Sequence, residues 1–168
     1  MAQPLMPHAT ASWLVENSSL TFEQIAEFCG LHVLEVKGIA DGSRLIPTDR
    51  FDDADMLRWM FWEQYNHEPN IATLRFWTGW VGLDNITEVQ RLQVPGKREA
   101  GNAALKLMDD HLARREWFVG EDISLADICL FAYTHVAGDA DFRLNAYPHL
   151  SSWIERVQKQ PNFLPMDG

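Results

Sequence analysis

Apolar residues recur at helical spacing along most of this chain, and no stretch keeps the alternation of apolar and polar residues that is typical of a half-buried strand. The predicted helices are, in chain order, residues 22–29, 31–39, 49–65, 97–115, 124–137 and 150–160, with a further apolar run at 71–81. Thr48 or Asp49 is expected to cap the long helix, and Pro69 to mark a break or kink in it. The polar stretch 82–96 contains Gly and Pro and is expected to form a loop or a frayed helix. The pattern predicts an all-α fold.

The first two predicted helices have clear end signals. Thr21 is a suitable N-cap for the first helix, and Gly30 is expected to end it. Asp41-Gly42 predicts the end of the second helix, with glycine just beyond its last turn. These signals favour a short helical pair that ends before residue 43.

The chain has 168 residues, 46% of them hydrophobic, which is enough for one core with a small second unit. Its net charge of −10 disfavours nucleic acids and anionic membranes as partners, because both are polyanions that bind clustered Lys and Arg. No apolar run reaches the length of a membrane span, and the first ten residues do not resemble a signal peptide. We therefore expect a soluble, cytoplasmic protein that does not bind membranes.

The residue types that usually carry metal or cofactor chemistry are scattered. Cys29 and Cys129 lie in apolar helical patterns outside any CxxC pair, which indicates buried thiols in a reducing compartment. The six histidines form no HExxH motif or Cys/His cluster, and the sequence has no P-loop or dinucleotide-binding glycine motif. We therefore expect neither a metal nor a cofactor.

A strong local motif lies at 120–128, with the sequence GEDISLADI. Ser124 and Asp127 have the spacing of a capping box, in which each side chain bonds the backbone of the other residue at a helix start. Ile123 and Ile128 occupy the positions of a hydrophobic staple. These residue types at this spacing indicate a structural role, so Asp127 is interpreted as a buried helix-start residue rather than a catalytic acid.

The same motif resembles the C-terminal domain of the glutathione transferase superfamily. The resemblance extends to LIPTD at 45–49, WMFWEQY at 59–65 and YPHLSSW at 147–153, and it covers about residues 44–168. It implies a helical bundle in which the capping box is a folding element. It also implies that the first helix and the loop after it line a hydrophobic co-substrate pocket, with Trp62, Tyr65 and His67 as the candidate residues. The alternative is that these aromatic residues belong to the core or to an interface.

In that family a Tyr, Ser or Cys of a thioredoxin-like domain activates the thiol of glutathione, and a cis-proline helps to hold the peptide. No such constellation is recognisable in this sequence, so we expect no conventional glutathione conjugation. An exposed helical face without its usual partner domain favours a homodimer or coverage by the N-terminal helices.

The N-terminal residues have the pattern of a helix-turn-helix, in which Ala26 allows close crossing and Gly30 makes the turn. Residues 4–42 resemble the beginning of a family of alphaproteobacterial cell-cycle transcriptional regulators. This resemblance implies DNA contacts by exposed residues of the second helix. The candidates for these contacts are His32, Val33, Glu35 and Lys37. Lys37 is the only Lys or Arg before residue 44, which argues against DNA binding.

The two resemblances predict a helix-turn-helix-like segment at 1–43 joined to a transferase-like helical domain at 44–168, as in a chimera. Our main functional expectation is a non-catalytic helical fusion protein that lacks the glutathione-binding domain and acts through self-association or partner binding. The alternative is a glutathione transferase relative, with a transferase-like activity if it is an enzyme, that binds glutathione or a hydrophobic ligand. A DNA-binding regulator is the third hypothesis.

Overall fold

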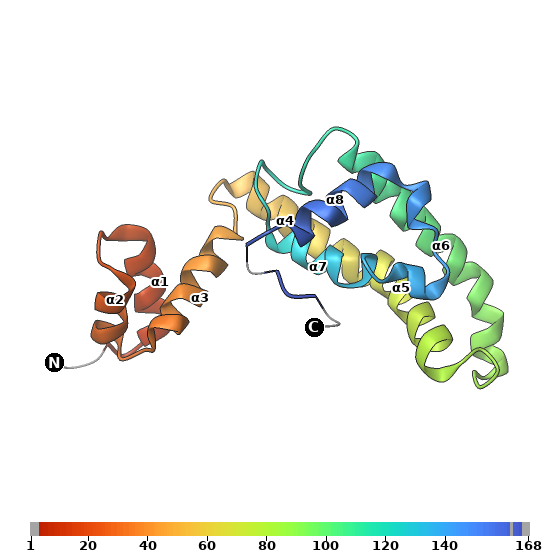
Figure 1. The fold of residues 1–168 in the computed structure, drawn as a ribbon, viewed down its shortest axis with the longest axis horizontal. Coiled ribbons are helices and arrows are strands. Elements are labelled where there is room, and N and C mark those ends of the chain that lie inside the picture. The colour runs from red at the N-terminus through yellow and green to blue at the C-terminus, as the bar shows by residue number, and fades with distance from the viewer. Residues whose placement is uncertain (1–3, 162, 166–168) are drawn as a thin grey trace. The chain divides into compact units, whose positions relative to one another are not determined.

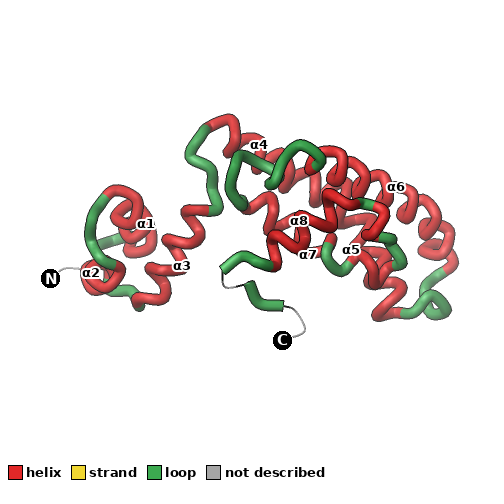
Figure 2. The backbone as a smooth tube through the Cα atoms, turned by 45° about the horizontal axis from the view of Figure 1, so that its top comes forward, coloured by secondary structure: helices red, strands yellow, loops and turns green. Residues whose placement is uncertain are grey.

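The computed structural model describes residues 4–161 and 163–165, and it describes only the backbone of residues 41–44. Every regular element in these ranges is helical (Figure 2), as the sequence predicts. The chain divides into two compact units, Met1–Ile46 and Pro47–Gly168, and each is described by itself. The boundary lies three residues after the predicted one at 43/44.

The first unit consists of α1 (Pro7–Asn17), α2 (Phe22–Cys29) and α3 (Val33–Arg44), which pack against one another around a small apolar core (Figure 1). Thr21 caps α2 as predicted, because the Gln24 N–H donates to Thr21 Oγ1 at 3.3 Å and the Thr21 N–H donates to Gln24 Oε1 at 2.9 Å. Gly30 ends α2 in the left-handed conformation, with φ of 68°. The core residues are Ala11, Ile25, Ala26, Cys29 and Val36.

Two predictions for this unit are wrong. Helix α1 was not expected, because only Ala11 is fully buried and its hydrophobic face is weakly defined. The predicted stop at Asp41-Gly42 does not end α3, which continues to Arg44. One glycine costs a helix only about 1 kcal/mol. The helix ends shortly before Pro47, where a proline disfavours continuation.

The second unit begins with a continuous helical path over residues 50–81. Asp49 caps it, accepting from the Phe51 and Asp52 N–H groups at 2.9 and 3.2 Å. The path comprises α4 (Arg50–Trp62), the π-helical segment η1 (Glu63–His67), α5 (Glu68–Arg75) and the π-helical segment η2 (Phe76–Val81). Pro69 lies in the first turn of α5, directly after η1, so it does not end the path. The wider π-helical turns accommodate the irregularity inside the helix.

Residues 82–96 are expected to form a loop or a frayed helix, but a regular helix, α6 (Glu88–Leu112), already begins at Glu88. Its start is fixed by Thr87 and Gln90: the Thr87 N–H donates to Gln90 Oε1 at 2.8 Å, and the Gln90 N–H donates to Thr87 Oγ1 at 3.3 Å. Pro95 lies inside the helix. Residues 87–90 have the T-x-x-Q pattern of a capping box, which sequence reasoning missed.

The unit ends with α7 (Leu125–Thr134), the 3₁₀ turns Ala137–Ala140 and Leu144–Ala146, and α8 (Pro148–Gln158). Helix α6 packs against α5 and α8, and α4 packs against α7 (Figure 1). The fully buried side chains include Trp59, Ile71, Leu74, Leu105, Phe118, Leu130 and Trp153. This core holds the path over 50–81 beside α7, where the polar and aromatic features described below lie.

Candidate ligand-binding groove

The Ser124–Asp127 capping box is present and buried. Asp127 Oδ2 accepts from the Ser124 N–H and hydroxyl, both at 2.9 Å. Its Oδ1 accepts from the Trp153 Nε1–H at 2.9 Å and the Phe118 N–H at 3.1 Å. Burial raises the pKa of the Asp127 carboxyl, and these hydrogen bonds oppose the rise. Both oxygens are occupied, so Asp127 acts as an anchor that ties α7 to α8.

The hydrophobic staple remains a prediction. Ile123 packs against the core of the second unit. Ile128, its expected partner, is largely exposed.

The predicted pocket residues do not converge on one cavity. Trp62 is half-buried and packs against Trp59, with ring centroids 5.3 Å apart. Tyr65 is 83% exposed, whereas His67 is completely buried. A pocket built from Trp62, Tyr65 and His67 remains a prediction that the arrangement does not favour.

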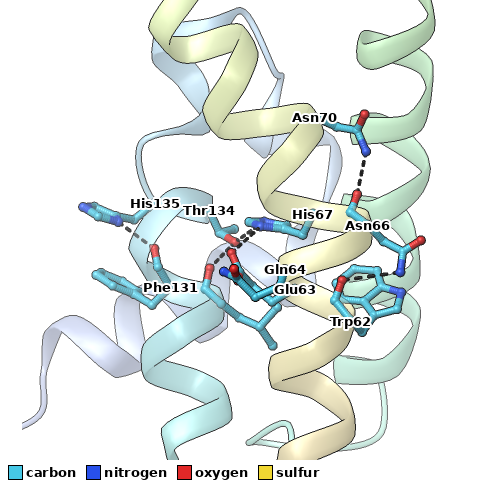
Figure 3. A network of polar contacts seen from close by, with 10 residues as sticks. Trp62, Glu63, Gln64, Asn66, His67, Asn70, Phe131, Thr134 and His135 are labelled. Carbon is cyan, nitrogen blue, oxygen red and sulfur yellow. Dashed lines mark hydrogen bonds and ion pairs between the residues drawn. The ribbon is translucent and has the colours of Figure 1, made fainter.

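His67 instead belongs to a buried polar cluster with Glu63 and Thr134 (Figure 3). The Thr134 hydroxyl donates its only proton to the Leu130 carbonyl at 2.6 Å. Thr134 Oγ1 must therefore accept from His67 Nε2, 2.9 Å away. In the neutral imidazole this network places the proton on Nε2 and a lone pair on Nδ1, whereas in the imidazolium both ring nitrogens would donate.

That lone pair faces a carboxylate. His67 Nδ1 lies 3.6 Å from Glu63 Oε1, and neither atom has a hydrogen-bond partner. Glu63 Oε2 accepts from Gln64 Nε2 at 2.7 Å. Direct contact between the two unpartnered atoms becomes attractive only when one of them holds a proton.

Cys129 is the half-buried thiol near this cluster. Burial, and secondarily the charge of Glu63, raises the pKa of the Cys129 thiol. A raised pKa favours the protonated thiol, so Cys129 lacks the lowered pKa of a reactive cysteine.

An aromatic groove opens beside this cluster, on α5, η2 and α7. It has a volume of about 440 Å³ and is lined by Glu68, Ala72, Thr73, Arg75, Phe76, Trp80 and Tyr133. Phe76 is 55% exposed and Trp80 is 76% exposed. Sequence reasoning missed these residues, although the aromatic residues four positions apart in the apolar run 71–81 were a signal for a shared face.

A second hollow, of about 540 Å³, is mainly polar. It is lined by Arg98, Asn102, Asp141, Arg143, Ala146 and Tyr147. Its one aromatic ring, Tyr147, donates its hydroxyl to the Asn102 side chain at 3.2 Å. The aromatic groove is therefore the better match for an apolar ligand.

In the first unit, two of the predicted DNA-contact residues bond each other at the start of α3. The His32 N–H donates to Glu35 Oε2 at 2.6 Å, and His32 Nδ1 accepts from the Leu34 N–H at 3.2 Å. Lys37 is exposed. Nothing in this arrangement tests DNA contact.

Over residues 4–161 and 163–165, no three His, Cys, Asp or Glu side chains converge as a metal site. Within those same ranges, no helix has both the length and the apolar character needed to span a membrane.

The family model "Glutathione S-transferase, C-terminal domain" matches residues 72–161. The chain belongs to this family. The match includes most of the aromatic groove and the Asp127 anchor, so both lie in the part of the chain that is typical of the family.

Individual relatives support the assignment. Glutathione S-transferase stcT of Emericella nidulans is 41% identical over 133 residues, which are 74% of this chain and 57% of that protein. A structure described as a possible glutathione S-transferase from Rhodopseudomonas palustris has a TM-score of 0.71 and 37% identity, over 82% of this chain and 61% of that one. A glutathione S-transferase structure from Pseudomonas fluorescens has a TM-score of 0.68 and 40% identity, over 77% and 63%.

The chain spans about half the length of the curated relatives that it matches. These findings correct the main functional expectation. A non-catalytic fusion protein is wrong, because the similar proteins and structures are glutathione S-transferases. They support the alternative of a glutathione transferase relative. The resemblance of residues 4–42 to cell-cycle regulators, and with it the chimera, stays a prediction.

Proposed function

We propose that this protein is a glutathione transferase relative whose aromatic groove binds the apolar part of a hydrophobic ligand. The observation that carries the proposal is the grouping of Phe76, Trp80 and Tyr133 around one open groove. Covering exposed aromatic surface with a ligand lowers the free energy of the complex, and clefts of this size accommodate small organic molecules.

Two features make the groove suitable for reversible binding. The core positions α5 and α7 so that residues from separate helices share one surface, which needs little reorganisation when a ligand arrives. Its polar side chains, Glu68, Thr73 and Arg75, lie among the rings, as in many small-molecule sites.

The transferase reaction itself belongs to the proposal. Relatives named glutathione S-transferase support glutathione as the co-substrate, and the aromatic groove supports a hydrophobic compound as its partner. Covering one exposed ring of about 100 Å² contributes about 2.5 kcal/mol. Removing such a ring is therefore expected to weaken binding by at least about tenfold.

The test is a fluorescence titration with the neutral apolar dye N-phenyl-1-naphthylamine. We expect saturable binding that Trp80→Ala or Phe76→Ala weakens about tenfold or more. Phe51→Ala is the matched control, because Phe51 is also an exposed aromatic residue but lies at the start of α4. Absence of saturable binding, or equal affinity in Trp80→Ala and Phe51→Ala, would overturn the proposal.

Calorimetry with glutathione tests the co-substrate separately. Saturable heats would support the transferase reading for this chain. Without them, glutathione recognition by this chain would be ruled out, while the dye titration still decides the groove.

Finer points of location and organisation are also proposals. Cys29 and Cys129 are both free thiols, which supports a reducing compartment such as the cytoplasm. A division of the chain near residues 43–47 supports separate N-terminal and transferase-like parts, and limited proteolysis there would test it. A homodimer, which mass measurement by light scattering would test, remains a proposal as well.

A further inference from the structure

We propose that the aromatic groove selects an amphipathic organic cation, in which a protonated or quaternary amine is joined to an aromatic or alkyl group. The inference rests on the proposed function, because it names the class of hydrophobic ligand that the groove takes. It comes from the charges and rings that line the groove, considered together.

Glu68 contributes an uncompensated negative charge. It is half-buried at the groove, and it makes no hydrogen bond or ion pair within the described residues. A half-buried carboxylate attracts a cation more strongly than a fully solvated one, because the local dielectric constant is lower and salt screens it less.

Arg75, the positive residue at the groove, is already paired. Its Nε donates to Asp139 Oδ2 at 2.9 Å, and its side chain is only 21% exposed. The pair is neutral as a unit, so the charge that remains for a ligand is that of Glu68. An anionic ligand would meet an Arg75 whose charge Asp139 already offsets, and it would also face the Glu68 charge.

The rings of Phe76, Trp80 and Tyr133 add to this preference. The face of an aromatic ring carries negative charge density and attracts an ammonium group, with tryptophan the most favourable. A ligand with a cationic head and an apolar body can therefore satisfy Glu68 and cover the rings at the same time. A neutral apolar compound can satisfy only the rings.

The experiment compares three compounds of similar size as competitors of the dye, at about 150 mM salt to screen the overall charge of −10. They are benzyltrimethylammonium, its neutral isostere neopentylbenzene, and the anion benzylsulfonate. We expect the cation to bind about tenfold more tightly than the isostere, and the anion to bind most weakly.

Glu68→Gln is expected to abolish the preference for the cation while keeping the affinity for neopentylbenzene. Glu68→Asp keeps the charge and should retain part of the preference. Glu121→Gln is the matched control, because Glu121 is exposed and its neighbour Gly120 lies beside Asp52. A Cβ added at Gly120 would be 3.3 Å from Asp52 Oδ2. Asp52 is sixteen residues before Glu68, which corresponds to roughly 24 Å along the helix. This distance is well beyond the screening length of about 8 Å, so a charge change near Asp52 should not affect a cation at Glu68.

Each outcome is decisive. Equal affinity for the cation and its isostere in the unaltered protein would overturn this inference, as would a cation preference that survives in Glu68→Gln or is lost in Glu121→Gln. If the dye and neopentylbenzene bind without any cation preference, only this inference fails. If the dye does not bind at all, the proposed function fails with it.

Discussion

The Glu63–His67 pair gives a sharp prediction for Glu63→Gln. The glutamine side chain has nearly the same shape as glutamate. Its carbonyl oxygen can accept from Gln64 as Glu63 Oε2 does, at 2.7 Å, while its NH₂ group faces the Nδ1 lone pair of His67. The change supplies the missing donor between two atoms that are now 3.6 Å apart, and it removes a buried charge.

The magnitude follows from the hydrogen bonds that each variant makes or leaves unmade. One satisfied hydrogen bond contributes about 1 kcal/mol. Glu63→Gln should therefore match the unaltered protein or exceed its free energy of unfolding by about 1 kcal/mol. His67→Leu removes the donor to Thr134 Oγ1 and leaves that buried oxygen one hydrogen bond short, which should cost about 1–3 kcal/mol.

Urea unfolding followed by circular dichroism at about pH 7.5 measures both effects, provided that the m-value stays constant. Glu121→Gln serves as an exposed control with the same charge change, and its expected effect is within about 0.5 kcal/mol. A loss of more than about 2 kcal/mol in Glu63→Gln would refute the lone pair on His67 Nδ1, and a His67→Leu protein as stable as the original would refute the hydrogen bond from His67 to Thr134.

Three other predictions concern stability. Gly101→Ala should lower the free energy of unfolding, measured with urea, by about 1–3 kcal/mol, although alanine favours a helix more than glycine does. The reason is that the new Cβ would lie 2.5 Å from Cζ of the buried Phe142. An unchanged free energy of unfolding would contradict this packing. Burial lowers the pKa of His111, so the unfolded chain binds a proton more readily than the folded protein. The free energy of unfolding should therefore fall as the pH drops below about 6.5. His111→Gln should weaken this dependence of stability on pH, and an unchanged dependence would argue against a role for His111. Thr87→Ala removes the cap of α6, in which Thr87 Oγ1 accepts from the Gln90 N–H at 3.3 Å, and should lower the free energy of unfolding by about 0.5–2 kcal/mol. An unaffected melting temperature would show that the cap does not stabilise the protein.

The sequence predicts the parts of the fold that local signals determine. Thr21 and Gly30 set the two ends of α2, and Ser124 with Asp127 sets the start of α7, because each cap is formed by residues close together in the chain. Even there, the partners of Asp127 Oδ1 are not local. Trp153 is 26 residues away, and no short motif indicates that contact.

The errors have the same physical origin. Pro95 predicts a break by its own chemistry, yet α6 continues through it, because tertiary packing overrides local propensity. The pocket grouping of His67 with Tyr65, which the resemblance implies, stays a prediction; the contact of His67 with Thr134, 67 residues away on α7, is one that no local pattern indicates. Phe76 and Trp80 of the groove lie four positions apart, but Tyr133 is 53 residues from Trp80, and no local pattern places its ring at the groove.

The central claim, that the groove on α5, η2 and α7 binds a hydrophobic ligand, is tested most directly by the indole N–H signals of the seven tryptophans in a ¹H–¹⁵N spectrum. Trp80→Phe assigns the signal of Trp80. On titration with N-phenyl-1-naphthylamine, the account predicts a saturable shift of the Trp80 signal, while the signal of Trp153, whose Nε1–H donates to Asp127 in the buried core, stays in place. A Trp80 signal that does not move when the protein is saturated with dye would contradict the account.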